Sequence, residues 1–244
     1  MAKTFKTTGI ALKSFKLGEA DRVITFLTRD GKLSAVAKGV RKTASKFGGR
    51  LEPGNDIDLV VTQGRNLGTV TQVQIKKARP WLRLDFDRTQ AAFAMMEMAE
   101  KLTAEKVADN SLVDLLGAAL DRLQTETCLP LLILAYDLKA LAMTGFLPYL
   151  SACVGCGSQA GLRRLTLGDG GLVCDNCYKG EEAVDIDKGD KDLLQRLLAS
   201  RLSELNAVVV DTEVIRSASK ALWAHIAYHV HGDFKTRTKD GWIE

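Results

Sequence analysis

Apolar and polar residues alternate with a period of two along the first third of the chain. The alternation is clear at residues 57–61 and again at residues 71–76. Such spacing sends successive side chains to opposite faces of a strand, so it predicts β-structure with one buried face. Asp30-Gly31 separates two such runs, residues 22–27 and 33–37, and suits a tight hairpin turn. About five short strands are too few for a sandwich and predict a small OB-type β-barrel, closed or partly open.

Beyond Pro80-Trp81 the apolar residues recur at intervals of three and four, which is the period of an amphipathic helix. Five helices are expected, with apolar stripes at residues 92–102, 112–123, 131–141, 193–205 and 214–222. Pro130 in the first turn and Gly145 beyond the last turn delimit the third helix, and Asp211 is the expected N-cap of the fifth. The polar tail, residues 235–244, is expected to fray.

Two C-x2-C pairs, seventeen residues apart, interrupt the helical part of the sequence. Their members are Cys153, Cys156, Cys174 and Cys177. Residues 165–167 and 172–173 flank a glycine-rich turn and predict a short hairpin that sets the second pair opposite the first. Four thiolates at this spacing predict one Zn²⁺ ion, and they leave no open coordination position, so the zinc is expected to be structural. The finger either contacts nucleic acid or protein, or only staples a long insertion between two helices.

These patterns predict an α+β fold. Residues 1–80 form an N-terminal OB-fold β-barrel for nucleic-acid binding, and residues 81–244 form an α-helical bundle with an inserted four-cysteine zinc finger at residues 151–179. Charge is divided in the same way. Residues 1–80 contain sixteen Lys and Arg against six Asp and Glu, a charge of +10, and the whole chain carries +4, so the remainder carries −6. A basic N-terminal third indicates contact with a polyanion.

The positive charge is concentrated between Arg29 and Arg50, in a run without acidic residues from Gly31 to Leu51. Its cations are Lys38, Arg41, Lys42, Lys46 and Arg50. Because unpaired cations are costly to bury, we expect a mobile, solvated loop that buries nothing. Phe47 is expected to offer a stacking plane to a base, as aromatic residues do in single-strand binders. The alternative is a basic surface loop that only keeps the protein soluble.

Other signals point away from membranes and catalysis. The first ten residues lack an apolar leader segment, and Pro148 with a cysteine pair interrupts the uncharged residues 140–162, so a cytoplasmic protein without membrane contact is expected. No phosphate-binding loop, dinucleotide motif or nucleophile elbow is present, so no small-molecule substrate is expected. His225 and His229 are spaced as metal ligands on a helix, but they continue its apolar stripe and lack an intervening glutamate, which favours a core role.

The N-terminal third carries an ordered series of short motifs: GE-x-DR at residues 18–22, FLT at 26–28, GKL-x-AVAKGVR at 31–41, SKFGG at 45–49 and LEP at 51–53. This order, followed by a helical part with a four-cysteine finger, resembles the bacterial RecO family of recombination mediators. The resemblance implies an OB-fold, a helical bundle carrying the finger, binding to single- and double-stranded DNA, and annealing of complementary strands. Members of the family differ in whether the cysteines are present, so zinc does not define the activity.

The resemblance also implies protein partners. Such proteins work with RecR, and in some bacteria with RecF, to load RecA onto DNA covered by single-strand-binding protein (SSB), whose C-terminal tail they contact. We therefore expect a non-enzymatic, nucleoid-associated DNA-binding protein in which the loop cations, with Arg22 and Lys32, neutralise phosphates. The alternative is a zinc-stapled helical adaptor in a transcription or RNA-processing complex, whose basic loop binds an acidic partner surface. A nuclease is disfavoured, because it requires clustered carboxylates and a hydrolytic metal.

Overall fold

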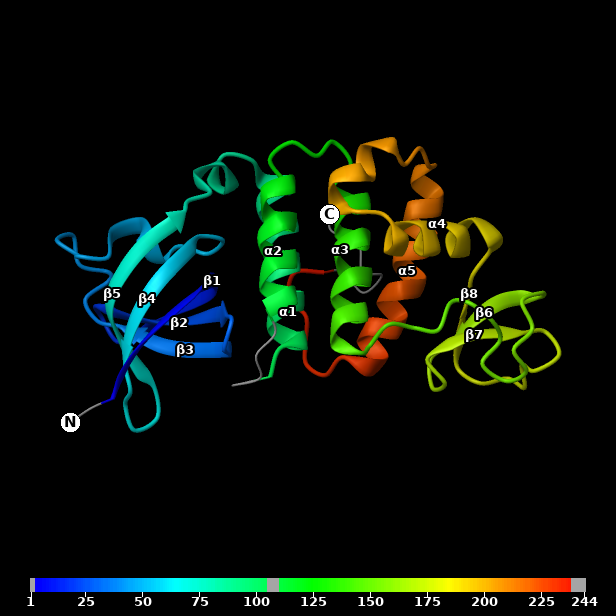
Figure 1. The fold of residues 1–244 in the computed structure, drawn as a ribbon, viewed down its shortest axis with the longest axis horizontal. Helices are drawn as coiled ribbons and strands as arrows, with labels where there is room; N and C mark the ends of the chain where they lie inside the picture. The colour runs from blue at the N-terminus through cyan, green and yellow to red at the C-terminus, as the bar shows by residue number, and fades with distance from the viewer. Residues whose placement is uncertain (1–2, 105–109, 238–244) are drawn as a thin grey trace. The chain divides into compact units, whose positions relative to one another are not determined.

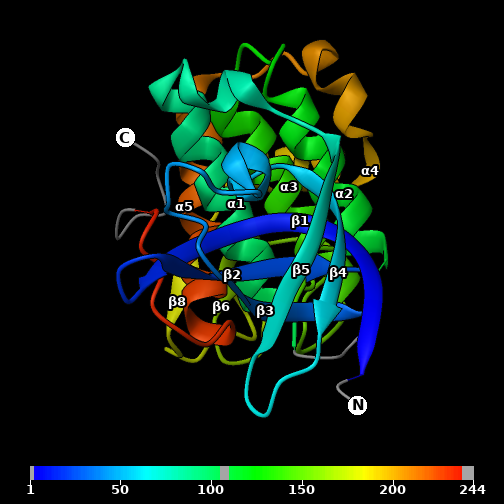
Figure 2. The same ribbon diagram turned by 90° about the vertical axis from the view of Figure 1, so that its left-hand side faces the viewer.

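The computed structural model describes residues 3–104 and 110–237, and the chain packs as two units, residues 1–124 and 125–244. In the first unit five strands close into a barrel in the order β1-β2-β3-β5-β4 (Figure 1). The strands are β1 (Thr4–Leu17), β2 (Asp21–Thr28), β3 (Gly31–Ala37), β4 (Asp56–Thr62) and β5 (Gly68–Lys77). Paired strands are antiparallel except β3 and β5, which run parallel (Figure 2). The predicted OB-type barrel is confirmed, and it is closed.

Alternate residues of the strands fill the barrel. Ile57, Leu59 and Val61 of β4 are buried in its core, as the period of two predicts. The hairpin turn predicted after Asp30 is also present, and Gly31 takes a φ of 102° there. Gly68 stands where β5 meets β3, and a Cβ atom at this position would lie 2.6 Å from the Val61 side chain. Closure of the barrel therefore requires a residue without a side chain at position 68.

Two helices contact the outside of the barrel. The helix α1 (Phe86–Leu102), which follows the 3-10 turn η2 (Pro80–Arg83), contacts β1, and α2 (Asn110–Arg122) contacts β1 and β2. Asp85 caps α1 by accepting a hydrogen bond from the backbone N–H of Arg88 at 3.0 Å. Ile10 and Leu27, a cross-strand pair that faces out of the barrel, are both buried. By packing, both helices belong with the barrel, and the functional boundary at residue 80 stays a prediction.

Arg79, which follows β5, is hydrogen-bonded to β4 and α2 of the first unit. Its side chain is 1% exposed. It donates to carboxylate oxygens of Asp56 at 2.7 Å and Asp121 at 2.9 Å, and to the carbonyl oxygens of Gly54 and Gly117. Asp121 and Gly117 lie on α2, whereas Asp56 begins β4. One buried guanidinium thus ties the barrel to the second of its helices.

Up to residue 237, where the described chain ends, the second unit contains three α-helices and a small sheet. The helices are α3 (Leu129–Thr144), α4 (Lys188–Ala199) and α5 (Thr212–His229), with the 3-10 turn η3 (Leu202–Ala207) between the last two. The sheet has the order β7-β6-β8, with β6 (Leu162–Thr166), β7 (Gly171–Cys174) and β8 (Ala183–Asp185). The positions of α3 and α5 and the hairpin of β6 and β7 follow the prediction, whereas the sequence pattern missed β8.

Helix ends in this unit follow local chemistry. Gly145 ends α3 in a left-handed conformation with a φ of 81°, and the Asp211 carboxylate caps α5 by accepting from the N–H of Glu213 at 3.0 Å. Both ends agree with the sequence. The single helix expected across residues 193–205 is wrong, because Ser200 and Arg201 adopt extended backbone angles and separate α4 from η3.

The expectation of a frayed tail is wrong for residues 235–237, while residues 238–244 lie outside the described residues. Arg237 forms a bidentate ion pair with Asp137 of α3, with N···O distances of 2.6 and 2.8 Å, and both side chains are 3% exposed. The guanidinium also lies 5.3 Å from the ring centre of Trp223, which packs edge-on against Phe234. Burial raises the pKa of Asp137, and the charge of Arg237 opposes this rise. These contacts fix the end of the described chain onto α3 and α5.

Candidate nucleic-acid interface and metal centre

The basic loop, defined as residues 38–50, is anchored to the turn between β1 and β2. The Asp21 carboxylate accepts a hydrogen bond from the N–H of Gly39 at 2.7 Å. Arg41 donates its backbone N–H to the carbonyl of Ala20 at 2.9 Å and its side chain to the carbonyl of Gly18 at 3.1 Å. The motif GE-x-DR therefore has a structural role, since its turn and its aspartate hold the start of the loop against the barrel.

The five cations of the basic loop are exposed and have no paired acid in the described part of the chain, although Arg41, Lys46 and Arg50 donate to backbone carbonyls. All of them are exposed, namely Lys38, Arg41, Lys42, Lys46 and Arg50. Within residues 3–104 and 110–237, none of the five takes part in an ion pair. Other cations of this unit, such as Lys13 and Arg29, do pair with acids, Glu100 and Asp114. The loop cations thus differ from Lys13 and Arg29 in having no acidic partner within the described residues.

The structure places only one of the two additional cations beside the loop. Arg22 pairs in register with Ala37, the residue before Lys38, so it lies at the loop end of the barrel. Lys32 lies at the opposite end of β3 from the loop. Along the strand it is six positions from Lys38, a distance of about 20 Å. Its Nζ donates to the backbone carbonyl of Glu100 at 3.2 Å. Lys32 therefore lies away from the loop, at the other end of β3, and its contact with phosphates stays a prediction.

Phe47 is wrong as a stacking plane. Its side chain is 2% exposed and packs with Leu51 in the core of the barrel, so the loop does bury part of itself. The Nζ of Lys46 lies 5.0 Å from the centre of the ring and covers it further. The exposed apolar side chains at this end are Phe15, 53% exposed, and Leu17, 43% exposed, on β1. Sequence reasoning missed them, although their alternation with Lys16 indicates a strand with one apolar face.

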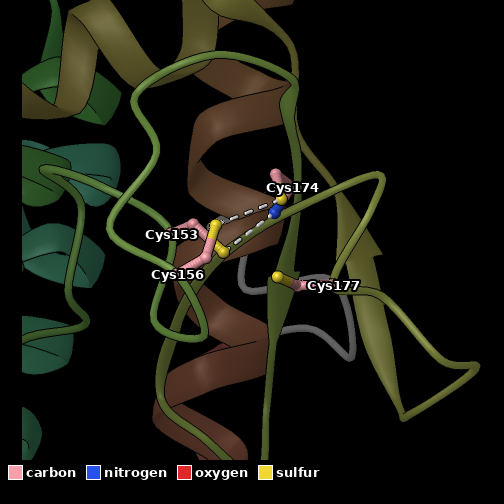
Figure 3. Close-up of side chains that lie close together, drawn as sticks. All are labelled: Cys153, Cys156, Cys174 and Cys177. Carbon is pink, nitrogen blue, oxygen red and sulfur yellow. Dashed lines mark hydrogen bonds between the residues drawn. The ribbon is translucent and has the colours of Figure 1, made fainter.

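The four predicted cysteines, one pair before β6 and the other at the end of β7, meet in one cluster (Figure 3). Their sulfur atoms all lie within 4.8 Å of one another, and the Sγ atoms of Cys156 and Cys174 are 3.7 Å apart. A tetrahedral ion with Zn–S bonds of about 2.3 Å requires sulfurs about 3.8 Å apart. A Cβ atom at Gly155 would lie 3.2 Å from Cys177 Sγ, so a side chain at this position would crowd the sulfur of the second pair. The four-cysteine donor set therefore fits a tetrahedral metal ion.

The electrostatics of the cluster favour a bound cation. Cys153 Sγ accepts the N–H of Cys174 at 3.4 Å, and this with further amide hydrogen bonds lowers the pKa of the Cys153 thiol to about 6. Hydrogen bonds with the neighbouring sulfurs, first that of Cys156, raise the pKa of Cys177 to about 12. Four thiolates this close repel one another, so without a cation the last of them holds its proton. A divalent ion would remove that repulsion.

His225 and His229 link α5 to two other segments, the residues after α3 and the finger hairpin. The Nε2 atom of His225 lies 2.8 Å from the carbonyl oxygen of Phe146, and that of His229 lies 2.7 Å from the carbonyl of Leu167. Because a carbonyl only accepts, each ring carries its proton on Nε2. Burial lowers the pKa of His225 to about 4, so this ring is neutral near pH 7. The core role favoured by the sequence agrees with these contacts.

The fold and the site define an α+β protein with an N-terminal OB-type barrel, an exposed basic loop and a four-cysteine cluster. Two family models match the chain: "Recombination protein O N terminal" over residues 1–79 and "Recombination protein O C terminal" over residues 83–238. The chain belongs to the RecO family of DNA repair proteins. Among the described residues, no helix has the length and apolarity needed to span a membrane.

Curated relatives agree with the family models over nearly the whole chain. A protein named "DNA repair protein RecO" from Frankia casuarinae is 38% identical over 232 residues, which is 93% of each chain. Its namesake from Nocardioides sp. is 34% identical over 242 residues, 95% of this chain and 97% of the relative. A third, from Alkaliphilus metalliredigens, is 32% identical over 229 residues, 92% of this chain and 93% of the relative.

Proposed function

We propose that this protein is a non-enzymatic mediator of recombination that binds and anneals DNA in the cytoplasm, at the nucleoid. By the family resemblance it acts with RecR, and with RecF where present, to promote RecA loading on single strands covered by SSB. The single observation that carries the DNA-binding part is the basic loop, whose five cations are exposed and stand in no ion pair within residues 3–104 and 110–237. Membership of a family of DNA repair proteins supports DNA as the polyanion.

Annealing follows from the same charges. Two complementary strands repel each other through their phosphates, and a protein that covers phosphates with Lys and Arg reduces this repulsion and releases counter-ions. The barrel provides the rigid support for the loop, because Asp21 and the β1–β2 turn hold the first residues of the loop in place. No bond is made or broken by the protein in this scheme, so it needs no catalytic residue and no nucleotide cofactor.

Salt dependence tests the proposal directly. If the loop and Arg22 neutralise about four to six phosphates, log K for a single strand falls against log salt concentration with a slope of about −3 to −4. The measurement is a fluorescence-anisotropy titration of a labelled oligonucleotide at several salt concentrations, repeated with a duplex of the same sequence. Affinity that does not change with salt would exclude phosphate neutralisation. Preference for an acidic protein over any oligonucleotide would favour the adaptor function instead.

We propose that the four cysteines hold one structural Zn²⁺ ion. When bound, the ion neutralises the thiolates and cross-links the two halves of the finger, and with four protein ligands it has no position for substrate. Mass spectrometry of freshly purified protein is expected to find about one equivalent of zinc. Cys174→Ser is expected to lower this below half an equivalent and to loosen the β6–β7 hairpin.

Cys128→Ser is the matched control for the zinc prediction, because Cys128 lies outside the cluster at the N-cap of α3. This variant is expected to retain the full metal content. Less than about half an equivalent of zinc in the unmodified protein, or the same loss in both variants, would contradict a four-thiolate site.

A further inference from the structure

The outer face of the barrel next to the basic loop carries an apolar row across three strands. Phe15 of β1 pairs in register with Val23 of β2, and Val23 pairs with Val36 of β3. Directly opposed residues of neighbouring strands lie on the same face, so these three side chains form one row. Val23 at the centre of the row is buried, whereas Phe15 is 53% exposed. The ring of Phe15 thus stands at the edge of a packed support with much of its surface in solvent.

Phe15 and Leu17 lie at the end of the β1–β2 pair that is next to the basic loop. At the other end of the β1–β2 pair, Ile10 and Leu27 are buried, and α1 and α2 are the helices that contact these strands. The ion pair of Lys13 with Glu100, 2.8 Å long, places the last turn of α1 beside β1 two residues before Phe15. Beyond that point Phe15 and Leu17, which share a face of the strand, remain exposed. Two large apolar side chains are therefore exposed to solvent at the end of β1.

Cations of the basic loop lie beside the same exposed face. Lys38 follows Val36 by two residues, in the turn directly after β3, and the next residue, Gly39, donates its N–H to Asp21 at the start of β2. The side chain of Arg41 is bound to the carbonyl of Gly18, 3.1 Å away, in the turn that directly follows Leu17. Lys38 and Arg41 are exposed and, within the residues the structure describes, stand in no ion pair. An aromatic ring with unpaired cations around it matches the chemistry of a base joined to its phosphates.

We infer that Phe15, supported by Val23 and flanked by Leu17, is the base-stacking platform of this protein, and that it selects single strands over duplex. This inference rests on the proposed function and assigns its ligand more closely. In a duplex the faces of the bases are already stacked on one another, whereas in a single strand an unstacked base can lie on the ring while Lys38 and Arg41 contact the adjoining phosphates. Platform and loop therefore have separable tasks: the loop binds any phosphate backbone, and the platform distinguishes the strands.

The test compares Phe15→Ala with the unmodified chain on a single strand and on its duplex. Loss of one stacked base is expected to weaken single-strand binding by about tenfold, with less than a twofold change for the duplex. The salt slope is expected to stay the same, because no phosphate contact is lost. An oligonucleotide containing 2-aminopurine is expected to lose the fluorescence quenching that accompanies stacking. Phe15→Trp is expected to restore affinity and quenching, whereas Phe15→Leu keeps an apolar side chain and is expected to restore neither.

Phe86→Ala is the matched control, because Phe86 is another exposed phenylalanine of this unit, 71% exposed, at the opposite end of α1 from Glu100. It is expected to leave both affinities unchanged. The platform is overturned if Phe15→Ala stays within twofold of the unmodified chain on single strands, or if single strand and duplex weaken equally. Charge reversal in the basic loop keeps the two hypotheses apart. If the charge-reversal variant loses DNA binding and Phe15→Ala does not, the platform is rejected and the DNA-binding loop is retained. If neither variant loses DNA binding, both hypotheses are rejected.

Discussion

Changing Arg41 and Lys42 together to glutamate is expected to weaken binding to single-stranded DNA by about a thousandfold. Each unit charge about 4 Å from a phosphate is worth about 1 kcal/mol in water, and the double reversal changes the local charge by four units. The sum, about 4 kcal/mol, corresponds to roughly three orders of magnitude in Kd. Because the loop is proposed to contact phosphates rather than bases, binding to duplex DNA is expected to weaken as well. Anisotropy titrations at one low salt concentration measure both losses, and the annealing rate of complementary strands is expected to fall with them.

Lys3→Glu combined with Lys6→Glu provides the matched control. Both lysines are exposed, and Lys6 lies ten residues of strand away from the loop end of β1. The double variant changes the net charge of the protein by the same four units but leaves the basic loop intact. It is expected to lower affinity by less than about tenfold, through the long-range field alone. Equal losses in the two double variants, with unchanged circular dichroism, would show that overall charge rather than the loop determines binding.

Features that depend on neighbouring residues could be read from the sequence. The period of two gave the strands of the barrel, Asp30-Gly31 gave the hairpin between β2 and β3, and Asp211 gave a helix cap. The cysteine cluster could be predicted for the same reason, because two residues between the sulfurs of each pair turn both toward one point. For the strands, the hairpin and the cap, the information lies within a few residues of the position concerned, and for the cysteines it lies in the repeated spacing of the two pairs.

Which aromatic residue is exposed could not be predicted, because exposure depends on contacts that are distant in the sequence. Phe47 stands among cations and glycines, and this composition indicates a solvated loop. The barrel, however, leaves an apolar space at this end that Phe47 and Leu51 fill. Phe15 stands in a strand of fourteen residues, longer than the part of the barrel that α1 and α2 cover. Phe15 remains in solvent because it lies near the end of this long strand.

Ion pairs between residues that are distant in the sequence could not be predicted either. Asp137 and Arg237 are separated by 100 residues, and nothing near either one predicts the other. The polar sequence of the tail predicts fraying. The buried carboxylate of Asp137 on α3, however, requires a cation, and Arg237 of the tail supplies it. The break between α4 and η3 is a similar case, since Ser200 and Arg201 interrupt a leucine pattern whose period alone favours one helix.

Arg79→Ala is expected to be the most destabilising single substitution considered for the first unit. All five N–H groups of the guanidinium have acceptors: Asp121 for Nε, Asp56 and Gly54 for Nη1, and Asp56 and Gly117 for Nη2. Removal of a buried, fully paired cation typically costs 3–5 kcal/mol. Asp56 and Asp121 are 27% and 38% exposed, so water can solvate them in part, and we expect a loss of about 3 kcal/mol. Urea unfolding followed by circular dichroism measures the total.

Arg79→Lys and Arg65→Ala separate the contribution of the hydrogen-bond network from that of charge. Lysine keeps the positive charge but offers three donors on one nitrogen atom and cannot reach β4 and α2 together, so Arg79→Lys is expected to lose most of the same stability. Arg65 is exposed in the loop between β4 and β5, and its replacement is expected to cost less than about 0.5 kcal/mol. Hydrogen exchange is expected to rise at β4 and α2 in the Arg79 variants alone. Full stability in Arg79→Lys would mean that charge, rather than the five-donor geometry, holds α2 to the barrel.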